Sequence, residues 1–109
     1  MTHEYSPAQP LRSEIDALPG AALLDFGTNW CGHCRASQPV VEQALQAHAG
    51  VRHLRVEDGS GRVLGRSYGV TRWPTLVFLR DGREVARLVR PLDLAQVQQA
   101  LALIDTARA

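Results

Sequence analysis

The sequence predicts an α/β domain built around a β-sheet that contains both parallel and antiparallel pairs. Segments with helical periodicity alternate along the chain with short apolar runs that are typical of buried strands. The turn Arg80-Asp-Gly-Arg83 also predicts a β-hairpin, because Asp-Gly tolerates positive φ. Strands that alternate with helices pair in parallel, and the hairpin adds an antiparallel edge. The 109 residues suit a single domain over 1–109.

The first elements follow from local sequence signals. Residues 1–10 are polar and contain two prolines, so we expect a flexible N-terminal arm with a short strand near Tyr5. Residues 11–18 predict a short helix that ends at the following Pro-Gly pair. Residues 21–26 form a compact apolar run, which suits a strand that is buried on both faces.

A longer helix is predicted from Cys31 to about His48. Its apolar residues recur at intervals of three and four and would form one buried stripe, which consists of Val40, Val41, Ala44, Leu45 and His48. Pro39 falls inside this helix, where a proline costs roughly 3 kcal/mol and kinks the axis. Gly50 then ends the segment.

The second half of the chain predicts three strands and two helices. The strands are expected at residues 51–56, 75–79 and 84–89, and the first of the two helices at residues 62–68. Asp93 is a suitable N-cap for the last helix, and Gln96 would complete a capping box with it. The apolar stripe of that helix consists of Leu94, Val97, Leu101 and Ile104.

Charge and composition exclude several functional classes. A net charge of +1 is too small to attract nucleic acid or a membrane surface. All twelve basic residues are arginines, so the lysine amine that Schiff-base chemistry needs is absent. No run approaches the roughly 20 apolar residues of a membrane-spanning helix. The N-terminus also lacks the apolar stretch of a secretory signal, so we expect a cytoplasmic protein.

The two cysteines, Cys31 and Cys34, lie at the start of the long predicted helix. A single close pair indicates redox or metal chemistry rather than a disulfide framework. The free N–H groups and the positive dipole end of a helix N-terminus stabilise a thiolate. We therefore expect Cys31 to be the exposed nucleophile and Cys34 the buried resolving thiol.

Two simpler interpretations of the cysteine pair are inert structural thiols and half of a zinc site. Zinc prefers four ligands, and the four histidines are not spaced convincingly to supply the missing two. His48 and His53 are more typical of surface or hydrogen-bonded core histidines. We therefore predict no metal.

The motifs around the pair resemble those of the thioredoxin family. The motif Trp30-Cys-Gly-His-Cys34 follows an apolar strand that ends in Asp-Phe, as the family's Trp-Cys-Gly-Pro-Cys motif does. Pro39 matches the family's helix-kinking proline, and residues 68–75 are similar to the segment that carries its cis-proline. The similarity covers about residues 11–105. It implies the thioredoxin fold, with helices on both faces of a central mixed sheet, and thiol–disulfide exchange without an organic cofactor.

The resemblance also implies roles for residues near the cysteines. Asp25 would exchange a proton with the resolving cysteine, and its burial would favour the neutral carboxyl group. An ungapped alignment places Arg55 where thioredoxins have a lysine. Pro74 would be a cis-proline whose loop binds the backbone of an extended partner, and Trp30 and Trp73 would face that partner. Simpler interpretations, a strand-end cap for Asp25 and core positions for the tryptophans, stay open.

One departure from the family lies between the cysteines. His33 replaces the typical proline and makes the motif similar to the Cys-Gly-His-Cys of protein disulfide isomerases. A partly charged imidazole beside Cys31 favours the thiolate and so stabilises the reduced form. We therefore expect Gly32 and His33 to tune the pair toward a more oxidising potential.

Other departures lie where the partner would bind. Trp73 stands before Pro74 where thioredoxins usually have a smaller aliphatic residue. Arg90 stands where they usually have a glycine, and a rim arginine should favour acidic partners. Gly27 stands where an aromatic residue is common. These changes favour a narrower set of partners than a general thioredoxin would have.

The sequence as a whole predicts a thioredoxin-like protein-disulfide oxidoreductase that works mainly as a reductase. Its partners would be protein disulfides and a recycling reductase, without nucleic acid or membrane, and we expect a monomer. An oxidase or isomerase, favoured by the Cys-Gly-His-Cys motif, is one alternative. A thioredoxin-like adaptor that binds partners without turning them over is the other.

Overall fold

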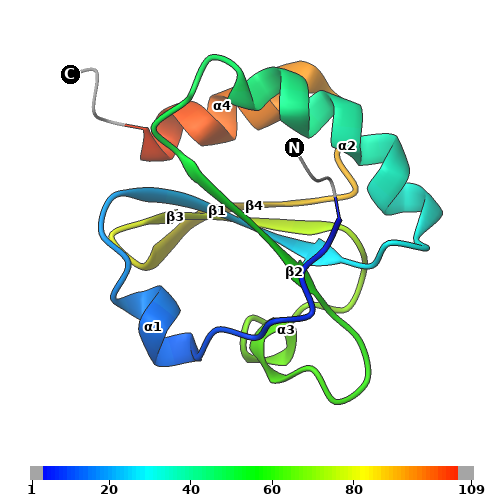
Figure 1. The fold of residues 1–109 in the computed structure, drawn as a ribbon. Coiled ribbons are helices and arrows are strands. Elements are labelled where there is room, and N and C mark those ends of the chain that lie inside the picture. The colour runs from blue at the N-terminus through cyan, green and yellow to red at the C-terminus, as the bar shows by residue number, and fades with distance from the viewer. Residues whose placement is uncertain (1–3, 106–109) are drawn as a thin grey trace.

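A computed structural model describes residues 4–105, which form a four-stranded sheet in the order β2-β1-β3-β4 (Figure 1). The strands are β1 (Ala21–Gly27), β2 (Arg52–Glu57), β3 (Thr75–Arg80) and β4 (Arg83–Val89). β1 pairs in parallel with β2 and antiparallel with β3, and β3 and β4 form the hairpin. The predicted mixed sheet is therefore confirmed.

Helices cover both faces of this sheet (Figure 1). α2 (Gly32–Leu45) and α4 (Leu94–Ile104) pack on one face, where their apolar stripes meet Leu23 and Phe78. α1 (Arg12–Asp16) and α3 (Val63–Ser67) lie against the other face. Because successive side chains of a strand point to opposite faces, Leu23 and Asp25 both face α2. The sequence pattern thus places Asp25 on the same side of the sheet as the cysteines.

The end of α2 differs from the sequence-based expectation. α2 ends at Leu45 rather than His48, and the backbone continues in a tighter turn in which the His48 N–H donates to the Leu45 carbonyl at 2.9 Å. Asp93 caps α4 as predicted, but its carboxylate accepts the Ala95 N–H at 2.9 Å. None of the helices among residues 4–105 is long and apolar enough to cross a bilayer.

The described part of the N-terminal segment lies against β2. Ser6 forms a parallel bridge with Val56. The Ser6 N–H donates to the Arg55 carbonyl, and the Ser6 carbonyl accepts the Glu57 N–H, both at 2.9 Å. This bridge places the buried Tyr5 beside the end of β1. Residues 1–3 of the predicted arm lie outside the described residues, and the flexibility of the arm stays a prediction.

Candidate active site

The two cysteines sit at the N-terminus of α2. Cys31 is the N-cap residue, with φ −81° and ψ 120°, and its Sγ accepts the backbone N–H of Cys34 at 3.1 Å. A sulfur in this position satisfies one of the free helix N–H groups and lies at the positive end of the dipole. The geometry therefore stabilises negative charge on Cys31.

Burial differs between the two thiols, but less than the sequence suggested. Cys31 is only 7% exposed and Cys34 is 2% exposed, so the expectation of an exposed Cys31 is wrong. Trp73 packs against the pair, and its carbonyl oxygen lies 4.0 Å from Cys31 Sγ. Burial, with a further contribution from Cys31, raises the pKa of the Cys34 thiol from 9.0 to about 12. Cys34 therefore needs a base before it can attack.

The loop that faces the cysteines contains Trp73 and Pro74, joined by a cis peptide bond. Arg90 follows β4 and lies beside this loop. Its N–H donates to the Pro74 carbonyl and its Nε donates to the Trp73 carbonyl, both at 2.9 Å. Arg90 has φ 53°, in the left-handed region that favours glycine, so its backbone conformation is the one a glycine would adopt at this position.

Two tryptophans flank the cysteine pair. Trp30 is 72% exposed, and its ring meets Trp73 edge to face with centroids 5.5 Å apart. The Trp73 Nε1 donates to Asp58 at 2.9 Å, which fixes the half-buried indole. Gly32 and His33, the first two residues of α2, are exposed beside Cys31.

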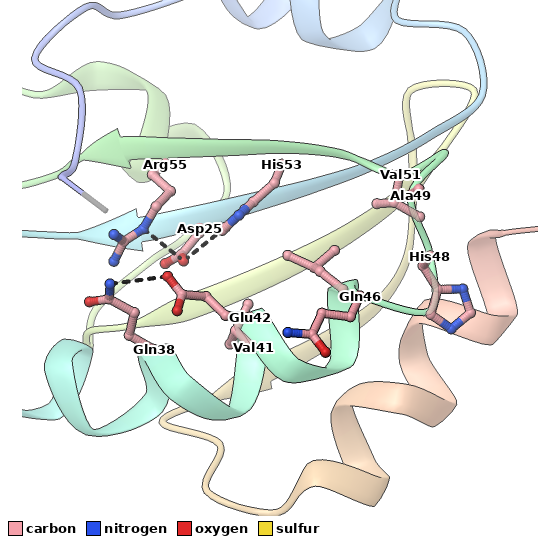
Figure 2. Close-up of a pocket in the computed structure, with 11 residues that line it drawn as sticks. Asp25, Gln38, Val41, Glu42, Gln46, His48, Ala49, Val51, His53 and Arg55 are labelled. Carbon is pink, nitrogen blue, oxygen red and sulfur yellow. Dashed lines mark hydrogen bonds and ion pairs between the residues drawn. The ribbon is translucent and has the colours of Figure 1, made fainter. Parts of the chain in front are cut away.

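Asp25 is buried behind the cysteines and accepts hydrogen bonds on both oxygens. Tyr5 Oη donates to Oδ1 at 2.7 Å. His53 Nε2 and Arg55 Nε lie 3.2 Å and 3.4 Å from Oδ2 (Figure 2). Arg55 lies beside Asp25 because the strand register pairs the two residues directly. The other two partners of Asp25 are not suggested by any motif.

A pocket of about 420 Å³ opens between β2 and α2 next to this cluster (Figure 2). Its wall combines apolar side chains with Asp25, His53 and Glu42. His48, at the far end of the pocket, is held by Asp105 at 2.6 Å, so both histidines of this region are hydrogen-bonded within the domain. Within residues 4–105, no group of three or more His, Cys, Asp or Glu side chains could hold a metal ion.

Comparison with known proteins identifies the family. The family model described as Thioredoxin matches residues 6–103 of the chain. The chain belongs to the thioredoxin family. It is similar to the structure of thioredoxin 2 from Pseudomonas aeruginosa PAO1 in its reduced form, with 53% identity and a TM-score of 0.82 over 92% of this chain and 93% of that one.

Curated thioredoxins also match. The Chlamydia trachomatis thioredoxin is 37% identical over 70 residues, which are 64% of this chain and 69% of that protein. The TPR repeat-containing thioredoxin TDX of Arabidopsis thaliana is 31% identical over 97 residues, and the match spans 83% of this chain but only 25% of that protein. This thioredoxin-family chain is a thiol–disulfide oxidoreductase. Family members act on protein disulfides through a redox-active cysteine pair and need no cofactor.

Sequence reasoning missed three residues that contact the predicted site residues. Tyr5 and His53 hydrogen-bond Asp25, and Asp58 holds the Trp73 indole. One sequence signal could have pointed to Tyr5. A glycine at position 27, where the family commonly has an aromatic residue, leaves space beside Cys34 for another ring.

Proposed function

We propose that this thioredoxin-family protein reduces disulfides of partner proteins, with Cys31 as the attacking and Cys34 as the resolving thiol. The observation that carries the proposal is the position of Cys31 Sγ, which caps α2 through the Cys34 N–H while Cys34 lies buried behind it. The helix N-terminus stabilises negative charge on the Cys31 sulfur, while burial keeps the Cys34 thiol protonated.

The reaction consists of two exchanges. The Cys31 thiolate attacks a partner disulfide, a mixed disulfide forms, and the partner's other sulfur leaves as a thiolate. Cys34 then loses its proton and attacks Cys31 Sγ. The Cys31–Cys34 bond forms, the bond to the partner breaks, and the partner has gained two electrons. Asp25, whose carboxylate is hydrogen-bonded to the tyrosine that packs against Cys34, accepts the proton.

The surface around Cys31 supports a role in partner binding. The Trp73–Pro74 loop lies beside the reacting sulfur, where the backbone of an extended peptide would contact it, and Trp30 offers an exposed apolar face. Arg90 places a positive charge at the rim of this surface, which favours acidic segments next to the partner's disulfide. A recycling reductase would use the same surface.

The exposed His33 favours a second candidate, an oxidase or isomerase, because a charged imidazole beside Cys31 stabilises the reduced pair. The reduction potential decides between the two. Thiol alkylation after equilibration in graded glutathione buffers would measure it. A potential at or below about −220 mV, the upper end of the cytosolic glutathione poise, supports the reductase and a cytoplasmic location. A clearly higher potential supports the oxidase or isomerase.

A reduction assay with a disulfide-bonded protein such as insulin tests the activity itself. We expect Cys31→Ser to abolish reduction, and Cys34→Ser to accumulate a mixed disulfide with the partner. An adaptor that only binds partners would show no reduction with the unmodified chain, and Cys31→Ser would leave its binding intact. We expect a monomer, which size-exclusion chromatography with light scattering would test.

A further inference from the structure

The space beside Cys34 is filled by Tyr5, from the segment that precedes the first helix. A Cβ atom added at Gly27 would lie 2.5 Å from Cys34 Sγ and 2.7 Å from Tyr5 Oη, distances at which atoms collide. The absence of a side chain at Gly27 therefore lets Tyr5 approach Cys34, and the tyrosine ring packs with both cysteines in one buried cluster. Tyr5 is 3% exposed.

The Tyr5 hydroxyl is oriented as a bridge. It donates its proton to Asp25 Oδ1 at 2.7 Å, so its oxygen lone pairs remain able to accept a hydrogen bond from the Cys34 thiol. Once Cys34 has lost its proton, the hydroxyl can instead donate to the ionised sulfur, and this hydrogen bond lowers the pKa of Cys34 in opposition to the larger effect of burial. A hydroxyl that contacts both a thiol and a carboxylate can pass a proton between them without becoming charged.

We propose that Tyr5 Oη relays the proton from Cys34 to Asp25 during the resolving step, an inference that rests on the proposed disulfide exchange. As Cys34 gives its thiol proton to Tyr5 Oη, Tyr5 gives its own hydroxyl proton to Asp25 Oδ1. The Cys34 sulfur then forms the bond to Cys31 Sγ, and the partner leaves with the electron pair of the broken bond. The partner disulfide is the oxidant, and the tyrosine is unchanged.

Charged and titratable groups from β2 and α2 surround the relay. From β2, the Arg55 guanidinium lies 4.0 Å from the centroid of the Tyr5 ring and 3.4 Å from Asp25 Oδ2. His53 also reaches Asp25, and Glu42 and His48 line the neighbouring pocket from the side of α2. Burial and the Asp25 carboxylate raise the pKa of Tyr5, so the hydroxyl is protonated at neutral pH and serves as a relay rather than as a base.

A water molecule beside Cys34 would be a second route for the proton. A cavity of about 30 Å³ touches Tyr5, Cys34, Thr28 and Arg55 and is large enough for a single water. Among the described residues, Thr28 Oγ1 and Arg55 Nη1 are buried without a hydrogen-bond partner, and both residues line this cavity. A water there would carry the proton independently of the tyrosine hydroxyl, and the test must separate the two routes.

Tyr5→Phe removes the hydroxyl and keeps the ring, and Tyr68→Phe is the matched control. Tyr68 is also buried, but it packs against Phe26 on the opposite face of the sheet. The aromatic disulfide 5,5′-dithiobis(2-nitrobenzoate) reports both chemical steps of the reduced protein. Attack by Cys31 releases one coloured thiolate at a rate that depends on reagent concentration, and attack by Cys34 releases the second at a rate that does not.

We expect Tyr5→Phe to slow the second phase roughly 10- to 100-fold at neutral pH, since a positioned acid–base group contributes about 10²–10⁴. The loss should shrink as the pH rises toward 12, because Cys34 then ionises without help. The first phase and the Tyr68→Phe protein should match the unmodified chain. The second phase of the double variant Tyr5→Phe/Asp25→Asn should be little slower than that of Asp25→Asn alone, because both changes remove groups from the same proton-transfer path.

Two results would overturn the relay. A second phase of unmodified rate in Tyr5→Phe would assign the proton to the cavity water. Equal slowing of both phases would mean that Tyr5 only supports the fold, and a lowered midpoint of thermal unfolding would then accompany it.

The solvent deuterium isotope effect on the second phase gives an independent check, because it should fall when the relay is removed. Failure of the proposed function is a separate result: the unmodified chain would show both phases but reduce no protein disulfide.

Discussion

Arg90 Nε donates a hydrogen bond of 2.9 Å to the Trp73 carbonyl, the same oxygen that lies 4.0 Å from Cys31 Sγ. The arginine thus occupies a backbone acceptor beside the reacting sulfur, where an extended partner would seek its own hydrogen bond. It also adds a positive charge at that point. A partner must either displace the guanidinium or place an acidic group against it.

Charge reversal at this position should invert partner preference. We expect Arg90→Glu to lower the reduction rate of a peptide disulfide flanked by aspartates about fivefold, and to raise the rate for a lysine-flanked peptide, since the exchange of attraction for repulsion at a rim is worth about 1 kcal/mol. The effect should weaken with added salt. Arg83→Glu, at the far end of the β3–β4 hairpin, is the control with the same change in charge. Equal changes for both peptides would contradict a role for Arg90 in specificity.

His33, one of the two residues between the cysteines, should influence the reduction potential of the pair. His33→Pro removes the imidazole beside Cys31, so the thiolate loses stabilisation and the disulfide becomes harder to reduce. We expect a potential lower by about 30 mV or more, equivalent to about 1.4 kcal/mol. His33→Gln keeps a flexible polar side chain without the charge and should move the potential in the same direction. If His33→Gln leaves the potential unchanged, the proline ring rather than the charge is responsible.

The parts of this structure that could be predicted from sequence depend on local patterns. The apolar runs and the Asp-Gly turn predicted the strands and the hairpin, and the segment that begins at the cysteine pair predicted a helix there. The end of α2 at Leu45 was missed because no glycine or proline marks it before Gly50.

The missed parts of the site depend on contacts between residues that are far apart in the sequence. Tyr5 and Asp25 meet across 20 positions, and His53 and Asp25 across 28. The second contact requires the parallel register between β1 and β2, which no pattern in either strand fixes. The burial of Cys31 likewise depends on Trp73, which reaches it only once the loop before β3 has folded. Periodicity describes single elements, so it carries no information about these distances.

The buried Cys34 thiol should make the stability of the reduced protein depend on alkaline pH. Its pKa is about 12 in the folded chain against 9.0 ordinarily, so the folded state holds this proton more tightly than the unfolded state. The stabilisation is therefore present in full below pH 9 and is lost as the pH rises from 9 to 12, by at most about 1.4 kcal/mol per pH unit. Urea unfolding of the reduced chain across this range measures it.

Cys34→Ser is the control for that measurement, because it has no thiol proton to lose. Buried tyrosines also titrate at alkaline pH, so both proteins should lose stability, and the reduced unmodified chain should lose more. Parallel stability curves for the two proteins would show that Cys34 is as easily ionised in the folded state as in the unfolded state.

Gly27 should tolerate no side chain, since the Cβ of an alanine would collide with Cys34 Sγ and with the Tyr5 ring and hydroxyl. We expect Gly27→Ala to cost about 1–3 kcal/mol of unfolding free energy, the usual range for an overpacked core. The displaced Tyr5 should also slow the second phase of the aromatic disulfide assay. Gly50→Ala, whose Cβ would meet nothing within 4 Å, is the matched control and should leave both stability and rate unchanged. A stable Gly27→Ala protein with an unmodified second phase would mean that Tyr5 and Cys34 are not held in contact, which would remove the geometric basis of the relay.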